Sequence, residues 1–173
     1  IDTDQLAESL TTLADLTTLR VGGPVRSYRE KSTEAELLDV VREADASGTH
    51  LLVLGGGSNV LASDEPFDGV VVRDLRRGLV TRESSACSGA DVVVPAGEVW
   101  DDLAARAVDE GWSGVEALSG IPGSVGATPV QNVGAYGQEV GDVLASVRTW
   151  DRARGRIRTF ARSELALGYR TSL

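Results

Sequence analysis

The sequence has very few of the residues on which many catalytic and structural sites depend. Among 173 residues there is no methionine, a single cysteine, Cys87, and a single histidine, His50. One cysteine cannot form an internal disulfide framework or a multi-cysteine zinc site. One histidine argues against a histidine-based metal centre and against a Ser-His-Asp triad. We therefore expect no metal site in this chain.

Long apolar runs and an excess of basic side chains are also missing. No apolar run approaches the roughly 20 residues that a membrane helix needs. The 17 basic and 26 acidic side chains give a net charge of −9, whereas a nucleic-acid-binding protein normally presents a basic patch. Residues Ile1–Leu16 have neither the basic start nor the apolar segment of a secretory signal. We expect a cytoplasmic protein with no nucleic-acid or membrane partner.

The composition that remains is typical of a soluble globular protein. Apolar residues make up 42% and charged residues 25% of the sequence, which is ordinary for this class. The length suffices for one domain, or two small ones, with a buried core. Because methionine is absent even at position 1, and the chain stops at Leu173 without a closing signal, we expect a processed or trimmed part of a longer protein.

Hydrophobic periodicity and turn residues predict alternating helices and strands. Thr33 followed by Glu36 is typical of a capping box at the start of a helix. This helix and the strands on either side of it predict a β-α-β unit. The expected helices span Thr3–Leu16, about 33–46 and Glu98–Glu110, and the expected strands span Val25–Lys31, Leu51–Leu54, Val70–Val72, Leu79–Arg82, Asp91–Pro95 and a hairpin of Val143–Asp151 with Arg156–Phe160.

The first glycine-rich motif, Leu54–Leu61 (LGGGSNVL), directly follows an expected strand. Its three glycines permit positive φ and close approach to a ligand, and consecutive N–H groups in such a turn bind anions such as a diphosphate. The motif is not a Rossmann fingerprint, because Val60 occupies the last glycine position and no helix follows. No Walker A sequence occurs either. Taken alone, three glycines are more typical of a turn without a ligand.

The second motif lies in a segment, Gly111–Gly141, that is rich in small residues and long for a connection. Its stretch Glu116–Glu139 (EALSGIPGSVGATPVQNVGAYGQE) combines glycines and prolines with neutral polar and apolar side chains. Neutral hydrogen-bonding groups beside apolar walls suit a large planar heterocycle with polar edges. The alternative is a compact Ω-loop packed on itself. We favour ligand binding, because length, glycine spacing and polar content agree.

The third candidate, Tyr169–Ser172 (YRTS), places an arginine beside an aromatic residue near the end of the chain. An arginine can bind a carboxylate through two parallel hydrogen bonds and stabilise negative charge nearby. From this chemistry alone, Arg170 is more simply a surface residue. The same interpretation applies to the pair Arg76–Arg77 and to the arginines within Arg152–Arg162, which we expect on solvated faces.

Four strings, in this order and spacing, resemble the UDP-N-acetylenolpyruvoylglucosamine reductase (UDP-N-acetylmuramate dehydrogenase) family: TTLRVGG, LGGGSNVL, GIPGSVGATPVQNVGAYGQEV and GYRTS. The arginine-rich sequence is similar to actinobacterial members. The resemblance implies an α+β fold, the two-lobed FAD-binding domain of the vanillyl-alcohol-oxidase (PCMH) type. The expected parts are an N-terminal helix or extension in 1–16, a small β-α-β lobe in 17–75 and a larger mixed lobe in 76–173, with the substrate-binding domain absent.

The resemblance also implies that FAD lies noncovalently between the two lobes. Its diphosphate would lie on Gly55–Asn59 and the IPGSVG segment, and its isoalloxazine near Ser119–Thr128 and Gln131–Tyr136. Neither glycine-rich motif holds a histidine or cysteine for covalent attachment. The expected cofactor-binding residues are Gly55, Gly56, Gly57, Ser58, Asn59, Val60, Leu61, Ser119, Ile121, Pro122, Gly123, Ser124, Gly126, Ala127, Thr128, Asn132, Gly134 and Tyr136.

By the same resemblance, NADPH reduces FAD, and the flavin then gives a hydride to the enolpyruvyl double bond of UDP-N-acetylglucosamine-enolpyruvate, a step of peptidoglycan synthesis. Hydride addition β to a carboxylate builds up negative charge there, which a fixed cation stabilises. The family's arginine corresponds to Arg170, the expected catalytic residue, and Tyr169 and Arg170 would bind the substrate. The resemblance thereby overturns the surface interpretation of Arg170.

The sequence departs from the family pattern mainly in what is missing. The family's serine proton donor, in a later G-S-F-F-x-N-P motif, and its glutamate near the C-terminus have no counterpart here. Ala127-Thr128 also stands where Gly-Ala is frequent, and Leu19 replaces a frequent Phe. We expect the FAD-binding half of a monomeric reductase, which alone binds FAD weakly, if at all, and does not turn over the sugar nucleotide. The alternatives are a noncatalytic flavin- or nucleotide-binding module and another oxidoreductase of the same flavin fold.

Overall fold

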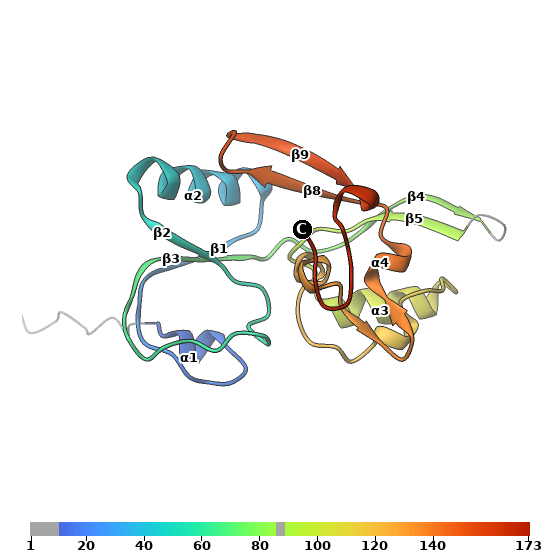
Figure 1. Ribbon diagram of the computed structural model, residues 1–173, viewed down its shortest axis with the longest axis horizontal. Coiled ribbons are helices and arrows are strands. Elements are labelled where there is room, and N and C mark those ends of the chain that lie inside the picture. Colours follow the sequence, from blue (N-terminus) through green and yellow to red (C-terminus); the bar gives the residue numbers. More distant parts are fainter. Residues whose placement is uncertain (1–10, 86–88) are drawn as a thin grey trace, which may run out of the picture.

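Two groups of elements lie side by side in the computed structural model of the chain, which describes residues 11–85 and 89–173 (Figure 1). Cys87 therefore lies outside the described residues. The helices are α1 (Leu13–Leu16), α2 (Glu34–Ser47), α3 (Trp100–Asp109) and α4 (Val140–Val143), and the strands are β1 (Val25–Lys31), β2 (His50–Val53), β3 (Phe67–Asp74), β4 (Val80–Ser85), β5 (Gly89–Val93), β6 (Gly134–Ala135), β7 (Gln138–Glu139), β8 (Ser146–Asp151) and β9 (Arg156–Ala161). Within these described ranges, no helix is long and apolar enough to cross a membrane.

The predicted β-α-β unit is confirmed, and β3 completes it as a parallel sheet. Both β1 and β2 pair in parallel with β3, so the strand order is β1-β3-β2. In this register Val71 of β3 lies between Tyr28 of β1 and Leu52 of β2. The helix that connects the outer strands, α2, has Thr33 as its N-cap, as the sequence predicts. It ends at Gly48, whose φ of 67° closes the last turn.

The N-terminal helix is shorter than predicted. The sequence predicts a helix over Thr3–Leu16, but α1 begins only at Leu13. The reason is Thr12, which is extended and caps the helix with its own side chain. The hydroxyl and the amide of Thr12 both donate to the Asp15 carboxylate, at 2.6 and 2.9 Å. The predicted helical residues 3–10 lie outside the described part of the chain.

Strand β3 is apolar on both faces because each face packs against a helix. Val71 joins a cluster with Leu13 of α1, whereas Val70 and Val72 join a cluster with Val40 of α2. Successive residues of a strand point to opposite faces, so a continuous run of valines supplies both clusters. Figure 1 shows the two helices on opposite sides of the sheet. Such a run is typical of a parallel strand covered on both faces.

The second group of elements packs around Trp100, the first residue of α3. Its ring is 2% exposed, and its Nε1 donates a hydrogen bond of 2.9 Å to the Leu118 carbonyl. Trp100 clusters with Leu103, Leu118 and Val140, whereas the two clusters beside the parallel sheet draw on residues up to Val72. These separate cores support a division of the chain near residue 75, which stays a prediction.

The predicted hairpin is confirmed in β8 and β9, but Val143, expected at its start, belongs to α4, and the hairpin contacts the first group of elements. Its strands pair in antiparallel register, and Figure 1 shows them extending from α2 toward the second group of elements. Arg148 of β8 forms an ion pair with Glu34 of α2. The guanidinium of Arg42 lies over the ring of Trp150, 4.7 Å from its centroid. The hairpin therefore ties the end of the chain to its first third.

Candidate functional site

Two glycine-rich ribbons meet between the two groups of elements. We define the first ribbon as Gly55–Asn59, which follows β2, and the second ribbon as Ile121–Thr128, which includes a 3-10 turn. A Cβ atom added to Gly56 would lie 3.0 Å from the Cα of Gly123. The two backbones therefore approach to van der Waals contact, which only glycine at this point of the first ribbon permits. The sequence predicts both ribbons but not this contact.

Free backbone donors distinguish the first ribbon. Within the part of the chain that the structure describes, none of the amide N–H groups of Gly55–Asn59 donates to a protein acceptor. The amides of Gly123 and Ser124 in the second ribbon are likewise without an acceptor there. The hydroxyl of Ser58 donates a hydrogen bond of 3.2 Å to the Pro122 carbonyl and joins the two ribbons. Consecutive free N–H groups in a glycine-rich turn are suited to an anion.

Gly57 fits a tight space behind the first ribbon. Its φ is 73°, and a Cβ atom there would lie 2.2 Å from the carbonyl oxygen of Leu16. The Thr18 amide donates a hydrogen bond of 3.0 Å to the Gly57 carbonyl. Nη2 of Arg73, in β3, donates at 3.0 Å to the Leu16 carbonyl. Residues 16–18, which the sequence leaves without a role, therefore support the first ribbon from behind.

Backbone hydrogen bonds fix the second ribbon on the segment that precedes α3. The amides of Val125 and Gly126 donate to the carbonyls of Glu98 and Ala96, at 2.9 and 2.8 Å. Thr128 is 4% exposed, and its hydroxyl donates at 2.8 Å to the Val125 carbonyl. The protein's own contacts therefore set the shape of this ribbon.

The third candidate from the sequence forms a tight turn, Gly168–Thr171, with Tyr169 and Arg170 at its tip. Nη2 of Arg170 donates a hydrogen bond of 2.8 Å to the Gly134 carbonyl. Tyr169 is 85% exposed. The φ of Arg170 is 54°, a region that non-glycine residues seldom occupy. The turn therefore holds an exposed arginine and an exposed tyrosine beside the predicted GAYG segment.

Asn132 holds this turn against the glycine-rich segment. Its side chain is buried, with the residue 2% exposed. Its Nδ2 donates to the Glu139 carboxylate at 2.7 Å and to the Gly168 carbonyl at 3.1 Å. Its Oδ1 accepts a hydrogen bond of 2.9 Å from the Gly141 amide. These contacts support a positioning role for a residue that the sequence predicts in the cofactor site.

The other predicted residues differ in their surroundings. Val60 packs against the core beside α1, whereas Leu61 and Tyr136 are 81% and 94% exposed. Asn59 donates a hydrogen bond of 3.3 Å from its side-chain amide to that of Gln131. The first ribbon is therefore connected both to the second ribbon and to the segment that follows it.

Ser119 is held by a carboxylate at the start of α3. The Asp101 carboxylate accepts hydrogen bonds from the Gly120 amide at 2.6 Å and from the Ser119 hydroxyl at 2.9 Å. Both bonds lower the pKa of Asp101, and the bond from the Gly120 amide has the larger effect. The hydroxyl predicted to face a cofactor thus has a protein partner, and it stays a predicted cofactor contact.

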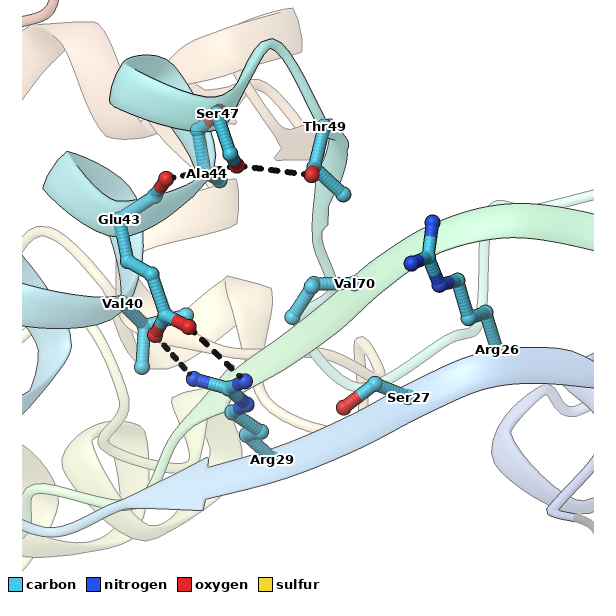
Figure 2. Close-up of a pocket in the computed structure, with 9 residues that line it drawn as sticks. All are labelled: Arg26, Ser27, Arg29, Val40, Glu43, Ala44, Ser47, Thr49 and Val70. Carbon is cyan, nitrogen blue, oxygen red and sulfur yellow. Dashed lines mark hydrogen bonds and ion pairs between the residues drawn. The ribbon is translucent and has the colours of Figure 1, made fainter.

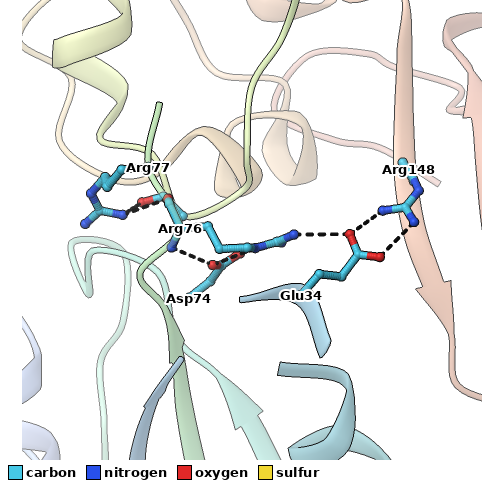
Figure 3. Close-up of polar contacts among 6 residues, drawn as sticks. Glu34, Asp74, Arg76, Arg77 and Arg148 are labelled. Atoms are coloured by element: carbon cyan, nitrogen blue, oxygen red, sulfur yellow. Dashed lines mark hydrogen bonds and ion pairs between the residues drawn. The ribbon is translucent and has the colours of Figure 1, made fainter. Parts of the chain in front are cut away.

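An ion-pair network lies where the chain passes from the first group of elements to the second (Figure 3). Arg76 binds both carboxylate oxygens of Asp74 and reaches Glu34 at 3.3 Å. Arg148 binds the same Glu34 carboxylate, at 2.8 Å from its Nη2. The hydrogen bond from Arg148 lowers the pKa of Glu34, and the one to Asp74 raises the pKa of Arg76. Because the Arg76 side chain is only 23% exposed, its predicted place on a solvated face is wrong.

A family model described as an FAD binding domain matches residues 27–161. The chain belongs to this family. It is 56% identical over 160 residues to the UDP-N-acetylenolpyruvoylglucosamine reductase of Cutibacterium acnes and 52% identical over 162 residues to that of Saccharopolyspora erythraea. These matches cover 92% and 93% of the chain, but only 42% and 44% of the two relatives. The predicted resemblance to the FAD-binding portion of this reductase family is confirmed.

Solved structures share the fold. The crystal structure of UDP-N-acetylenolpyruvylglucosamine reductase from Thermus caldophilus has a TM-score of 0.73 at 31% identity and covers 94% of this chain and 55% of that chain. A solvent-stable cholesterol oxidase has a TM-score of 0.64 at 19% identity over 90% of this chain and 32% of its own, which shows the fold alone. The predicted fold class, the α+β FAD-binding domain of the vanillyl-alcohol-oxidase type, is confirmed.

Membership of this family supports FAD as the cofactor, and the residues present fit that group. The free amides of Gly55–Asn59 suit a diphosphate, because they are donors without competing acceptors. The second ribbon adds neutral polar groups beside Ile121 and Val125, which the fold places at the core around Trp100. Sequence reasoning found both ribbons but missed Thr18 and Arg73 behind them, although Thr18 lies in the TTLRVGG string.

Proposed function

We propose that this chain is the FAD-binding half of a reductase that converts UDP-N-acetylglucosamine-enolpyruvate to UDP-N-acetylmuramate with NADPH as the hydride donor. One observation carries the proposal: the first ribbon has free amides, and its backbone contacts the second ribbon where Gly56 meets Gly123. The names of the relatives from Cutibacterium acnes and Saccharopolyspora erythraea support the reaction class. The oxidoreductase would act in the cytoplasm, as a monomer, in peptidoglycan synthesis.

The chain's own residues would bind the dinucleotide without a covalent bond. Gly55–Asn59, together with Gly123 and Ser124, would donate amide hydrogen bonds to the diphosphate. Ser119 and the rest of the second ribbon would lie beside the ring system, and Tyr136 would cover it with an exposed aromatic ring. Thr128 and Asn132, which are buried and hydrogen-bonded within the protein, would hold these segments in place.

Arg170 would stabilise the charge that develops on the substrate. Bound FAD supplies hydride transfer between NADPH and the enolpyruvyl double bond. Arg170 is anchored through one nitrogen to the Gly134 carbonyl, and its planar guanidinium has further donors for a carboxylate. A cation fixed in this way lowers the energy of the state in which that carboxylate gains negative charge. Tyr169, exposed beside it, would help to bind the substrate.

The chain spans less than half the length of the two relatives described above, 42% and 44%. The serine and the glutamate that the family uses as acids have no counterpart in this sequence. We therefore expect the 173 residues alone to bind FAD weakly, if at all, and to show no turnover. Steady NADPH oxidation by the chain alone, dependent on UDP-N-acetylglucosamine-enolpyruvate, would contradict this expectation.

A chimera tests the proposed function directly. The chain would replace the matching residues of the Cutibacterium acnes relative, and the purified protein would be examined for flavin absorbance and for substrate-dependent NADPH oxidation. We expect a yellow, active protein.

Arg170→Ala in the chimera should retain the flavin spectrum but lose turnover by at least about a hundredfold. Arg106→Ala, on the surface of α3, is the matched control and should leave both unchanged. A folded chimera without flavin would refute the proposal, and flavin without reduction by NADPH would favour a noncatalytic binding module.

A further inference from the structure

An open cavity lies at the first ribbon, where Gly56 forms part of its lining. Its volume is about 650 Å³, and it is lined by residues 14–18, Arg20, Gly56 and Arg73. This volume falls within the range of small-molecule sites, roughly 300–1,000 Å³. The only lining residue that belongs to either ribbon is Gly56. The cavity therefore extends the predicted cofactor site toward α1, through residues to which the sequence assigns no role.

The lining of this cavity holds more positive than negative charge, with two arginines and one aspartate. Within the described part of the chain, neither Arg20 nor Arg73 forms an ion pair. The Nε–H of Arg73 is buried without an acceptor there, although its Nη2 donates to the Leu16 carbonyl. The Asp15 carboxylate in the lining is already bonded to the amide and hydroxyl of Thr12. A half-buried cation without a counter-charge is unfavourable, so the cavity is suited to an anion.

The neutral groups in the lining point to the same class of ligand. The amide of Gly56 and the hydroxyl of Thr18 have no protein partner among the described residues. Arg20 has a φ of 54°, and a non-glycine residue in this region costs energy that is commonly retained at binding sites. The available groups are thus mostly donors, and an anion with several acceptor oxygens, such as a phosphate ester, satisfies them together.

A second cavity shows what a charge-balanced cavity looks like in this protein (Figure 2). It lies between α2 and the strands β1 and β3, and its volume is about 140 Å³. Its Arg29 binds the Glu43 carboxylate at 2.6 Å. Its Ser47 and Thr49 hydroxyls bond to each other at 2.8 Å. Because these groups have partners and the volume is small, we assign no ligand to it.

We propose that the cavity of Arg20 and Arg73 binds the phosphate nearest the adenosine of FAD, with the Thr18 hydroxyl as a further donor. The inference rests on the proposed function, because it identifies which residues of the chain hold the adenylate half of the dinucleotide. Gly56 lines the cavity and also belongs to the first ribbon, so one diphosphate can lie across both. It follows that the chain distinguishes FAD from FMN through two arginines outside the glycine-rich motifs.

Binding of ADP, FAD, FMN and inorganic phosphate to the chimera described above, freed of flavin, tests this inference. Each ligand would be titrated to millimolar concentration while the midpoint of thermal unfolding is recorded, since a ligand of the folded state raises it. Arg20→Gln and Arg73→Gln should each weaken ADP and FAD about tenfold, the loss of one charge-assisted contact. FMN should be unaffected. The control is Arg26→Gln, because Arg26 is exposed and pairs with Asp68 away from this cavity.

The outcomes separate this inference from the proposed function. If FAD binds but both variants bind ADP and FAD as the unchanged chimera does, the cavity assignment is wrong and the proposed function stands. If ADP binds through the arginines but the chimera takes up no flavin, the proposed function is wrong and the anion site stands. If the unchanged chimera does not respond to ADP, or responds equally to inorganic phosphate, the assignment to an adenylate is wrong. If Arg73→Gln does not fold, the exposed Arg20→Gln decides.

Discussion

Glu34, the first residue of α2, and Arg148, in β8, are 114 residues apart in the sequence and form a two-point ion pair in the structure (Figure 3). The same Glu34 carboxylate accepts a hydrogen bond from Arg76, which also binds Asp74 at the end of β3. A Cβ atom on Gly97 would lie 2.4 Å from the Asp74 carbonyl oxygen. The network therefore joins the hairpin, α2 and the segment that carries the second ribbon.

A double-mutant cycle on Glu34 and Arg148 should give a small, salt-sensitive coupling. Their side chains are 39% and 53% exposed, so water screens the attraction, and we expect a coupling energy of about 0.5–1 kcal/mol. The measurement is the free energy of urea unfolding of Glu34→Gln, Arg148→Gln and the double variant, at low and high salt. Arg106 with Glu110, within α3, provides a control pair of similar exposure. A coupling that is unchanged by salt would contradict an ion-pair origin.

The stability of the chain should depend on pH through Tyr28. Burial, and then the hydrogen bond to Glu30, raise the pKa of Tyr28 from 10.0 to about 12. In that interval the unfolded chain releases a proton that the folded chain retains, so the free energy of unfolding falls as pH rises from about 10 to about 12. Below pH 10.0 this contribution is fully present. Urea unfolding of the unchanged chain and of Tyr28→Phe, at about pH 9 and about pH 11, measures the difference. Equal pH dependence of the two proteins would contradict the assignment.

Replacement of Asn132 should loosen the turn that holds Arg170. Asn132→Ala removes the hydrogen bonds to Glu139 and to the Gly168 carbonyl and leaves the Gly141 amide without its partner. We expect a loss of about 2–3 kcal/mol in the free energy of unfolding, and faster hydrogen exchange at the amides of Gly168 and Thr171. Gln131→Ala is the control, because among the described residues the Gln131 side chain bonds only to Asn59. Equal exchange in the two variants would show that Asn132 does not position the turn.

Local patterns were sufficient to predict part of the fold. The bounds of β1, Val25–Lys31, and the cap at Thr33 follow from short-range signals, namely residue type and a side chain that bonds three residues ahead. The start of α1 was missed because leucine spacing does not reveal that Thr12 binds Asp15. Only Val70–Val72 was predicted for β3, because its flanking residues are recruited by pairing with β1, which no local pattern encodes.

Local patterns likewise predict one part of the candidate site and miss another. Glycine spacing predicts two ribbons, but the contact of Gly56 with Gly123 depends on how distant segments fold. Arg73 could not be singled out, because one arginine in a strand looks like any other until Leu16 and the cavity are in place. Arg76 was assigned to a solvated face because its approach to Glu34, 42 residues earlier, depends on the fold, although its other partner, Asp74, is a near neighbour in the sequence. Motifs identify backbone shape, whereas charge pairing requires the tertiary structure.

The packing behind the first ribbon can be tested with two glycines that share a backbone conformation. Gly57 and Gly137 have φ values of 73° and 83°, so alanine at either position costs about 1–2 kcal/mol of backbone strain. A Cβ atom at Gly137 meets nothing within 4 Å, whereas one at Gly57 would lie 2.2 Å from the Leu16 carbonyl oxygen. That oxygen also accepts the hydrogen bond from Arg73, so it cannot move without disturbing the ribbon's support.

We therefore expect Gly57→Ala to lower the free energy of unfolding by at least about 2 kcal/mol more than Gly137→Ala. In the chimera, Gly57→Ala should also weaken FAD binding, because displacement of Leu16 disturbs both the first ribbon and Arg73. Gly137→Ala should leave FAD binding unchanged. Urea unfolding and a flavin titration of the two variants measure both effects. If the variants lose stability equally, positive φ alone explains the glycine at position 57, and the close contact with Leu16 does not determine the shape of the ribbon.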